Sequence, residues 1–307
     1  MKRKLLILGG NGMLGSSILR LAKNHYEIEA PNREKLDLFD KNKILNFFKK
    51  ERPFYVINCA AKVGGIYANT NFPADFIYEN LLIQNNVIYA CHSFKIKKLV
   101  FIGSSCIYPR NCKQPIKEKY LLSSALEETN EYYSVAKIAG LKMIEAFNKQ
   151  YRHNFISIMP TNIYGIKDNF DNKNSHVIPG LITKIHNGFK KKKSFVKLWG
   201  SGKALRDFLY VDDVATAILF LMKNYNQNQP INVGSGKEIT IKHLSKLISE
   251  IIGYKGRIIF DHSYPDGTPR KILDINKIKE LGWKPTISLK DGLKKTIEWY
   301  IINKKKL

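Results

Sequence analysis

Apolar residues follow two different spacings along this chain of 307 residues. Short, mostly apolar runs lie at residues 4–10, 26–31, 55–61, 98–105 and 155–165. In the longer stretches between them, apolar residues recur every three or four positions, which is the spacing of an amphipathic helix. This alternation predicts βαβ units with a parallel sheet. The continuous apolar runs YVIN and LVFI are typical of strands that are buried on both faces.

Helical spacing is clearest in six stretches, and the second of them is long and half apolar. They cover residues 16–25, 72–94, 131–147, 212–225, 239–253 and 287–305. Between about residue 165 and residue 212 the chain is irregular, polar and rich in Gly and Asn, and a strand and turn are expected at residues 230–236. We expect an α/β protein with a Rossmann-type doubly wound parallel sheet and a smaller C-terminal α/β lobe.

The two predicted lobes are interleaved along the chain. The nucleotide-binding domain is expected to contain residues 1–165 and about 207–236. The smaller substrate-binding lobe is expected to contain about 166–206 and 237–307. No internal repeat is visible in the sequence.

Composition limits the kind of protein this can be. Hydrophobic residues make up 44% of the chain, which is enough for a sizeable core, and the formal net charge is +25. A solvated lysine-rich surface is the first explanation of that charge, anionic ligands the second and nucleic acid the third. No nucleic-acid-binding signature accompanies the charge. The apolar run at the N-terminus is too short for a signal peptide, and no stretch has the length of a membrane span.

The cysteines indicate a reducing compartment. Cys59, Cys91, Cys106 and Cys112 form no CxxC pair and share no regular spacing with histidines. Neither a disulfide framework nor a metal site is therefore expected. A cytoplasmic location follows from this as a prediction.

The glycine-rich turn after the first predicted strand is suited to a dinucleotide. The string LLILGGNGMLG fits GxGxxG from Gly10 and GxxGxxG from Gly9, through Gly12 to Gly15. The second alignment is favoured because the strand is expected to end at Leu8. Glycines let the backbone and a helix N-terminus approach a pyrophosphate closely.

The end of the second predicted strand bears on the choice of cofactor. An acidic residue there would hold a ribose 2′-hydroxyl, whereas a basic residue would hold a 2′-phosphate. Asn32 and Arg33 stand at this position. Arg33 therefore favours NADP over NAD, with an ordinary surface arginine as the alternative.

A serine and a tyrosine–lysine pair stand where a reacting group would be expected. In EYYSVAK, Tyr133 and Lys137 are four residues apart and share one helix face if the stretch is helical. Ser104 follows an apolar strand, at the sheet edge where such folds bind ligands. Tyr300 and Lys304 have the same spacing, but no such strand and serine precede them. The context therefore favours Tyr133.

These motifs together resemble the extended short-chain dehydrogenase/reductase family, and in particular its GDP-L-fucose synthase group, which are GDP-4-keto-6-deoxymannose 3,5-epimerase-4-reductases. The resemblance spans nearly the whole chain. It rests on the strings NCAA, AKVGGI, PADFIYEN, GSSCIYP, ETNEYYSVAKIAG, MPTNIYG, DNF, SHVIP, WGSG, FLYVDD, YKGRIIFD and PDGTPRK.

The resemblance implies two sets of catalytic residues. Tyr133 would donate a proton to the oxygen at C4 of a keto sugar, Ser104 would hydrogen-bond the same oxygen, and Lys137 would lower the pKa of Tyr133. Cys106 and His176 would exchange the protons at C3 and C5, since a thiol and an imidazole titrate near neutrality. Without the resemblance, the simpler interpretation would be that Cys106 is a packing residue at the end of a strand and that His176 caps a helix.

The resemblance also implies binding residues for NADP and for a GDP-linked 4-keto sugar. Those expected at the cofactor are Gly9, Gly12, Met13, Leu14, Gly15, Arg33, Asp37, Leu38, Ala60, Ala61, Lys137, Pro160, Asn162, Ile163 and His176. Those expected at the substrate are Ser105, Asn162, Lys184, Trp199, Arg206, Arg257, Asp266 and Arg270. Family likeness further implies a homodimer, formed through two long helices, and residues 72–94 are one candidate.

Several departures keep alternatives open. Asn11 stands where relatives can carry a basic residue, and Glu128 and Tyr132 replace prolines that are common in the group. The sugar could therefore be a hexose or a larger heptose. A 4,6-dehydratase is improbable because Ser105 and Cys106 stand where those enzymes carry acidic residues. A C4-reductase that follows a separate epimerase and a non-catalytic NADP-sensing Rossmann protein are the other hypotheses.

Overall fold

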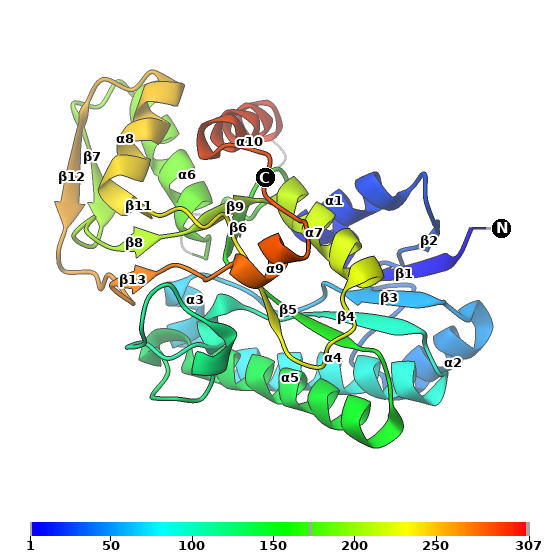
Figure 1. Ribbon diagram of the computed structural model, residues 1–307. Helices are drawn as coiled ribbons and strands as arrows, with labels where there is room; N and C mark the ends of the chain where they lie inside the picture. Colours follow the sequence, from blue (N-terminus) through cyan, green and yellow to red (C-terminus); the bar gives the residue numbers. More distant parts are fainter. Residues whose placement is uncertain (1, 172–173, 305–307) are drawn as a thin grey trace.

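The computed structural model describes residues 2–171 and 174–304, and it is built around one parallel sheet of six strands. Figure 1 shows this sheet between two layers of helices, with a smaller lobe at one end. The strand order is β10 (Ile231–Val233), β5 (Ile156–Pro160), β4 (Lys98–Ile102), β3 (Tyr55–Asn58), β1 (Lys4–Leu8) and β2 (Glu27–Glu29). The predicted Rossmann-type doubly wound sheet is confirmed.

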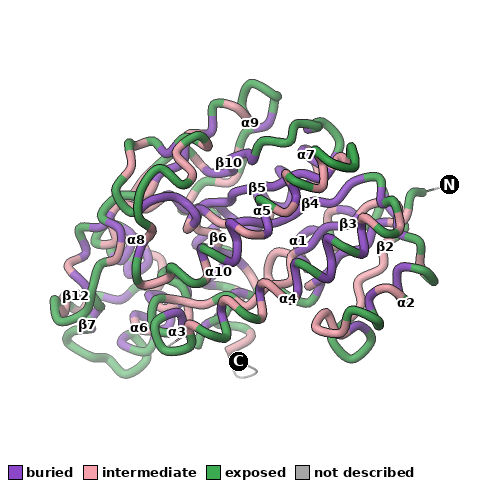
Figure 2. The backbone as a smooth tube through the Cα atoms, turned by 90° about the horizontal axis from the view of Figure 1, so that it is seen from below, coloured by how far each residue is buried: buried purple, intermediate pink, exposed green. Residues whose placement is uncertain are grey.

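Alternate residues of each strand supply the two faces of the sheet. Leu5 and Ile7 of β1 pack toward α1 (Met13–Ala22), α7 (Val211–Asn224) and α9 (Asn276–Glu280). Leu6 and Leu8 pack toward α2 (Lys41–Glu51), α4 (Pro73–Ser93) and α5 (Glu131–Tyr151). Because both faces are covered, the central strands are buried throughout, as Figure 2 shows.

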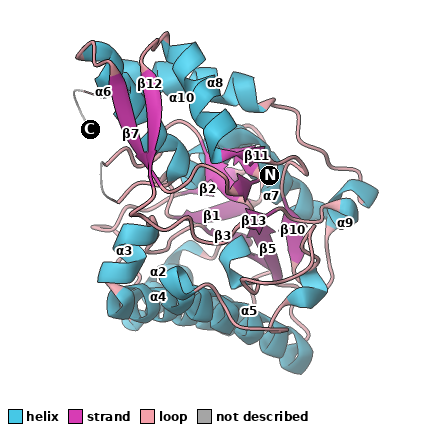
Figure 3. Cartoon of the chain, turned by 90° about the vertical axis from the view of Figure 1, so that its left-hand side faces the viewer, coloured by secondary structure: helices cyan, strands magenta, loops and turns pink. Residues whose placement is uncertain are grey.

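The smaller lobe combines short strands with three helices, and Figure 3 shows it above one end of the sheet. Its strands are β7 (Phe195–Trp199) paired with β12 (Arg257–Asp261), and β8 (Leu205–Arg206) between β11 (Ile239–Thr240) and β13 (Arg270–Lys271). Its helices are α6 (Val177–Lys190), α8 (Ile241–Ile252) and α10 (Leu289–Asn303). The strands β6 (Asn162–Tyr164) and β9 (Phe208–Tyr210) pair in parallel beside it. The short helix α3 (Ile66–Asn71) precedes α4.

Helix α6 is a helix that the sequence pattern did not predict. Pro179 and Gly180 near its start, and Gly188 near its end, broke the apparent pattern. Proline is tolerated in the first turn of a helix because its missing N–H has no partner there. The apolar face of α6 packs on α8, so tertiary contacts stabilise it.

Two other predicted boundaries differ from the structure. Residues 155–165 were expected to form one strand, but the chain leaves the main sheet at Thr161, whose hydroxyl donates to the carbonyl of Asp207 at 3.0 Å. The segment continues as β6 in a different sheet. Leu273, Ile275 and Trp283 pack into the core of the main sheet rather than into the smaller lobe.

The remaining predictions of helices hold to within a few residues. Helix α1 begins three residues earlier than expected, and α10 occupies most of the predicted 287–305, of which the last residue lies outside the described part of the chain. Among the described helices, none combines the length and the apolar character that crossing a membrane requires.

Candidate active site

A cavity of about 860 Å³ opens at the carboxyl ends of β1, β3, β4 and β5. The glycine-rich turn after β1 lines one end, and residues from β7, β8 and the loop before β13 line the other. The two lobes therefore share its wall. A crevice at the carboxyl ends of parallel strands is where folds of this kind bind ligands.

The glycine-rich turn forms a close-packed cradle at one end of the cavity. Gly9 has φ +78°, and a Cβ at Gly9 would lie 2.8 Å from the backbone nitrogen of Ala60. A Cβ at Gly15 would collide with the carbonyl oxygen of Gly9. Helix α1 begins directly after Gly12, which provides no side-chain cap, so its first backbone N–H groups are available to a ligand. β1 ends at Leu8, which supports the GxxGxxG alignment.

Arg33 lies at the rim of this end of the cavity. Its side chain is exposed, and its guanidinium carbon lies 5.0 Å from the centre of the Phe39 ring. Within residues 2–171 and 174–304, Arg33 makes no ion pair. Asp37 and Leu38 also line this end, and the carboxylate of Asp37 accepts a hydrogen bond from the backbone of Phe39 at 3.0 Å. The rim therefore offers a guanidinium with no competing carboxylate partner.

Ser104, Tyr133 and Lys137 come together at the middle of the cavity. Tyr133 and Lys137 lie on one face of α5, and Ser104 follows β4. Lys137 is 5% exposed, and its Nζ donates to the carbonyl of Ile102 at 2.9 Å and lies 5.9 Å from the centre of the Tyr133 ring. Burial lowers the pKa of Lys137 to about 8.

The pKa of Tyr133 differs from the expectation. Burial raises it and the nearby Cys106 adds to that rise, while a hydrogen bond with Ser104 opposes them. The predicted lowering by Lys137 does not appear, because the ammonium is directed at the carbonyl of Ile102 rather than at the phenol. Tyr133 is thus held as a neutral phenol, which is the form that donates a proton.

Cys106 faces the same space as Tyr133. Its Sγ accepts hydrogen bonds from Nδ2 of Asn130 at 3.3 Å and from Nζ of Lys271 at 3.8 Å. The side chain is partly exposed and lines the cavity. Because the sulfur faces ligand space rather than the core, the packing interpretation does not describe it.

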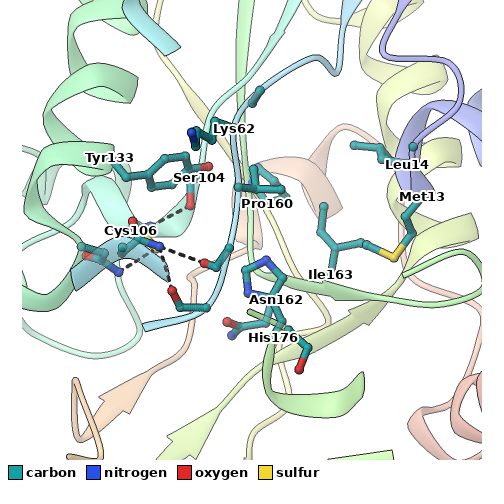
Figure 4. Close-up of a pocket in the computed structure, with 18 of the residues that line it drawn as sticks. Met13, Leu14, Lys62, Ser104, Cys106, Tyr133, Pro160, Asn162, Ile163 and His176 are labelled. Atoms are coloured by element: carbon teal, nitrogen blue, oxygen red, sulfur yellow. Dashed lines mark hydrogen bonds between the residues drawn. The ribbon is translucent and has the colours of Figure 1, made fainter. Parts of the chain in front are cut away.

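His176 lies across the cavity from this group, beside Asn162, as Figure 4 shows. It occupies the N-cap position of α6, yet its side chain makes no capping hydrogen bond. The imidazole is open to the cavity, and the surrounding protein lowers its pKa by desolvation. The capping interpretation is therefore not what the structure shows, and the neutral imidazole is suited to accept a proton.

The far end of the cavity combines an aromatic stack with cations. Trp199 is 41% exposed and stacks on Tyr264 with ring centres 4.6 Å apart at 12°. Nζ of Lys184 lies 3.7 Å from the centre of the Trp199 ring. Nη2 of Arg206 donates to the carbonyl of Asp266 at 3.2 Å, and desolvation by burial lowers the pKa of Arg206. A planar base and a diphosphate fit this combination of groups.

Two predicted substrate residues lie outside the cavity lining. Arg257 is exposed at the start of β12. Arg270 forms a forked ion pair with Glu238, at 2.8 Å from Nε and 3.0 Å from Nη2. Its neighbour Lys271 points to the opposite side of β13 and reaches Cys106, because adjacent strand residues alternate between faces.

The other predicted residues all contribute to the cavity wall. They are Met13, Leu14, Ala60, Ala61, Pro160, Ile163, Ser105 and Asn162. Nδ2 of Asn162 donates to the carbonyl of Asp207 at 2.8 Å. By contrast, Tyr300 belongs to the core of the smaller lobe and stacks on Phe170, so the second tyrosine–lysine pair is structural. Among the described residues, no cluster of three or more His, Cys, Asp or Glu is arranged to hold a metal ion.

Sequence reasoning missed several residues of the site. Asn130 and Lys271 contact Cys106, and Glu127 lines the cavity while accepting a hydrogen bond from the hydroxyl of Thr268 at 3.1 Å. Asn130 lies one helical turn before Ser134 and belongs to the same sequence string as Tyr133. Its position next to Tyr133 in the sequence could therefore have identified it as a residue of the site. Nothing in the sequence joins Glu127 to Thr268, which are far apart along the chain.

The chain is similar to proteins of known family over nearly its whole length. Residues 5–234 match the NAD dependent epimerase/dehydratase family. A protein of Arabidopsis thaliana, "Putative GDP-L-fucose synthase 2", is 49% identical over 302 residues, which cover 98% of this chain and 92% of that protein.

Two solved structures from Campylobacter jejuni share the fold across 98% of each chain. A "GDP-6-OMe-4-keto-L-xylo-heptose reductase" superimposes with a TM-score of 0.92 at 36% identity. A "GDP-mannoheptose C4 reductase" with NADP bound superimposes with a TM-score of 0.88 at 38% identity.

Proposed function

Because this chain belongs to the NAD dependent epimerase/dehydratase family, we propose that it is an NADPH-dependent reductase acting at C4 of a GDP-4-keto-deoxy sugar. The observation that carries the proposal is the meeting of Ser104, Tyr133, Lys137, Cys106 and His176 in one cavity. A non-catalytic NADP sensor has no need for a proton donor, a thiol and an imidazole at the same point.

The cradle at one end of the cavity fits a dinucleotide. The absence of Cβ atoms at Gly9 and Gly15 leaves the backbone close enough for a pyrophosphate at the start of α1. Arg33 would hold the 2′-phosphate that distinguishes NADP, and Asp37 and Leu38 would lie beside the adenosine half. When bound, NADPH supplies the hydride for reduction.

The residues of the chain supply everything else that reduction at C4 needs. Tyr133 is a neutral phenol beside Ser104, so it can transfer its proton to the oxygen at C4 as negative charge develops there. Ser104 adds a hydrogen bond to the same oxygen. Nζ of Lys137 lies 5.9 Å from the centre of the Tyr133 ring but donates to the carbonyl of Ile102, so we propose Lys137 as a cofactor-binding residue rather than as a group that lowers the pKa of Tyr133.

Epimerisation at C3 and C5 is the second half of the proposal. Protons beside a ketone are acidic, and inversion needs one group that removes a proton and another that returns it. Cys106 and His176 line the cavity from opposite walls, which is the arrangement that inversion requires. Trp199, Tyr264 and Lys184 lie at the far end, beyond the proposed sites for NADP and the sugar. We propose that they contact the guanine of the substrate.

Both sizes of sugar have support. The relative from Arabidopsis thaliana is named for fucose, a hexose, whereas the solved structures are named for heptoses. Tyr132, which replaces a proline common in the group, is 50% exposed and stands next to Tyr133, but it does not line the cavity. We therefore expect its side chain not to contact the sugar directly.

The test of the proposal is incubation of the protein with GDP-4-keto hexoses and heptoses. We expect NADPH to be consumed in the presence of at least one of these sugars, with deuterium uptake from D₂O at C3 and C5. NADPH absorbance and mass spectrometry of the sugar measure the two steps separately. If no GDP-4-keto sugar causes NADPH consumption, the proposal is wrong.

The cofactor preference has its own prediction. Arg33→Gln removes the only guanidinium at the rim among the described lining residues, so we expect the KM for NADPH to rise by about tenfold, while the KM for NADH stays the same. NADH is the matched control because it differs only in lacking the 2′-phosphate. An equal effect on both cofactors would show that Arg33 does not contact that phosphate.

A homodimer and a cytoplasmic location complete the proposal. Helices α4 and α5 lie side by side along the outer layer of Figure 1, and Tyr78 and Tyr89 of α4 and Val135 of α5 are exposed on them. A second copy would cover these apolar side chains. The four cysteines are free thiols, as in a reducing compartment.

A further inference from the structure

A second concavity lies at the amino ends of the strands, at the opposite edge of the sheet from the candidate active site. In Figure 1 this is the side where the N-terminus and the start of β1 lie. Of its eleven lining residues, six are basic, and none of those described is acidic. The basic residues are Lys2, Arg3, His25, Lys97, Lys98 and Lys223. We call this concavity the amino-edge site.

In the described part of the chain, no carboxylate pairs with the basic residues of the amino-edge site. Across residues 2–171 and 174–304, none of the six basic side chains forms an ion pair. The nearest acidic residues along β2 and α2 are Glu27 and Glu51, and both pair with Lys4, at 3.5 Å and 3.3 Å. Positive charge therefore accumulates here locally, and the net charge of +25 for the whole chain does not by itself explain the grouping.

Lys98 differs from the other basic residues of the amino-edge site because its side chain is buried. It is 3% exposed, and its Nζ donates to the carbonyl of Tyr225 at 2.6 Å and to Oδ1 of Asn226 at 2.8 Å. Both acceptors are uncharged. Burial, together with the charge of Lys97, lowers the pKa of Lys98 to about 8. The carbonyls at the end of α7 offset part of this charge, but an anion in the concavity would offset more.

We propose that the amino-edge site binds a phosphorylated small molecule that carries at least two negative charges. The phosphate groups would lie among Lys97, Lys98, Lys223 and Arg3. Because this site and the candidate active site occupy opposite edges of the sheet, both can be filled at the same time. The ligand is therefore separate from the cofactor and the sugar substrate.

Inorganic pyrophosphate is the probe, and its binding is measured by calorimetric titration on protein saturated with NADP⁺ and GDP. We expect saturable binding that weakens by about tenfold in Lys97→Gln/Lys223→Gln, since two exposed charges near the phosphates are removed. Lys191→Gln/Lys192→Gln removes the same charge from an exposed turn of the smaller lobe and should change the affinity little. Equal affinities in the two variants, or binding that never saturates, would overturn the site.

Tyr133→Phe should bind pyrophosphate as the wild type does, so this outcome is independent of the reductase proposal.

Discussion

Replacement of Tyr133 by phenylalanine should lower kcat for the GDP-4-keto sugar by about 10²- to 10⁴-fold, the usual contribution of a positioned acid. The phenyl ring keeps the contact with Phe76, whose ring centre lies 6.2 Å away, so the cavity wall should be preserved. Only the proton donor is lost. NADPH consumption under substrate saturation measures the effect.

Tyr132→Phe is the matched control for this experiment. Tyr132 is the preceding residue on α5 and is 50% exposed, so the same hydroxyl is removed one position away. We expect this variant to keep most of the wild-type kcat, because Tyr132 does not line the cavity. A Tyr133→Phe enzyme with wild-type turnover would exclude Tyr133 as the proton donor.

Replacement of Cys106 by serine should separate the two proposed reactions. We expect the exchange of sugar protons with D₂O to fall by about 10²-fold or more, because a serine hydroxyl is a far weaker acid than a thiol and does not form the anion that removes a proton at neutral pH. Reduction of a sugar that already has the product configuration at C3 and C5 should continue, since Ser104, Tyr133 and Lys137 are intact. Mass spectrometry of deuterium uptake, with and without NADPH, measures the exchange.

Cys112→Ser provides the control for a loss of thiol in general. Cys112 packs against the main core and does not line the cavity, so both reactions should continue. Wild-type protein that reduces the sugar without any proton exchange would favour the alternative, a C4-reductase that acts after a separate epimerase. In that case Cys106 and His176 would serve only to bind the substrate.

The sequence itself determined the main sheet and the pairing of Tyr133 with Lys137 in the candidate active site. Both depend on local patterns: the runs at β3 and β4 are apolar throughout because both faces of these strands are buried, and Tyr133 and Lys137 share a face because they are one helical turn apart. The turn from Gly9 to Gly15 was also predictable, because only glycine leaves room for the backbone to pack so closely.

Other features depended on contacts between distant parts of the chain. Helix α6 could not be predicted because its two glycines oppose helix formation, and its packing on α8 overrides them. The departure of the chain from the main sheet at Thr161 likewise depends on a bond to Asp207.

Which side chains face the cavity was decided only by the tertiary structure. Arg270 and Lys271 are adjacent and both basic, and the register of β13 turns the first toward Glu238 and the second toward Cys106. The amino-edge site has the same origin, since Arg3, Lys98 and Lys223 meet only after β1, β4 and α7 have packed. Sequence spacing specifies neighbours within one helix or strand, whereas neighbours across elements are specified by packing.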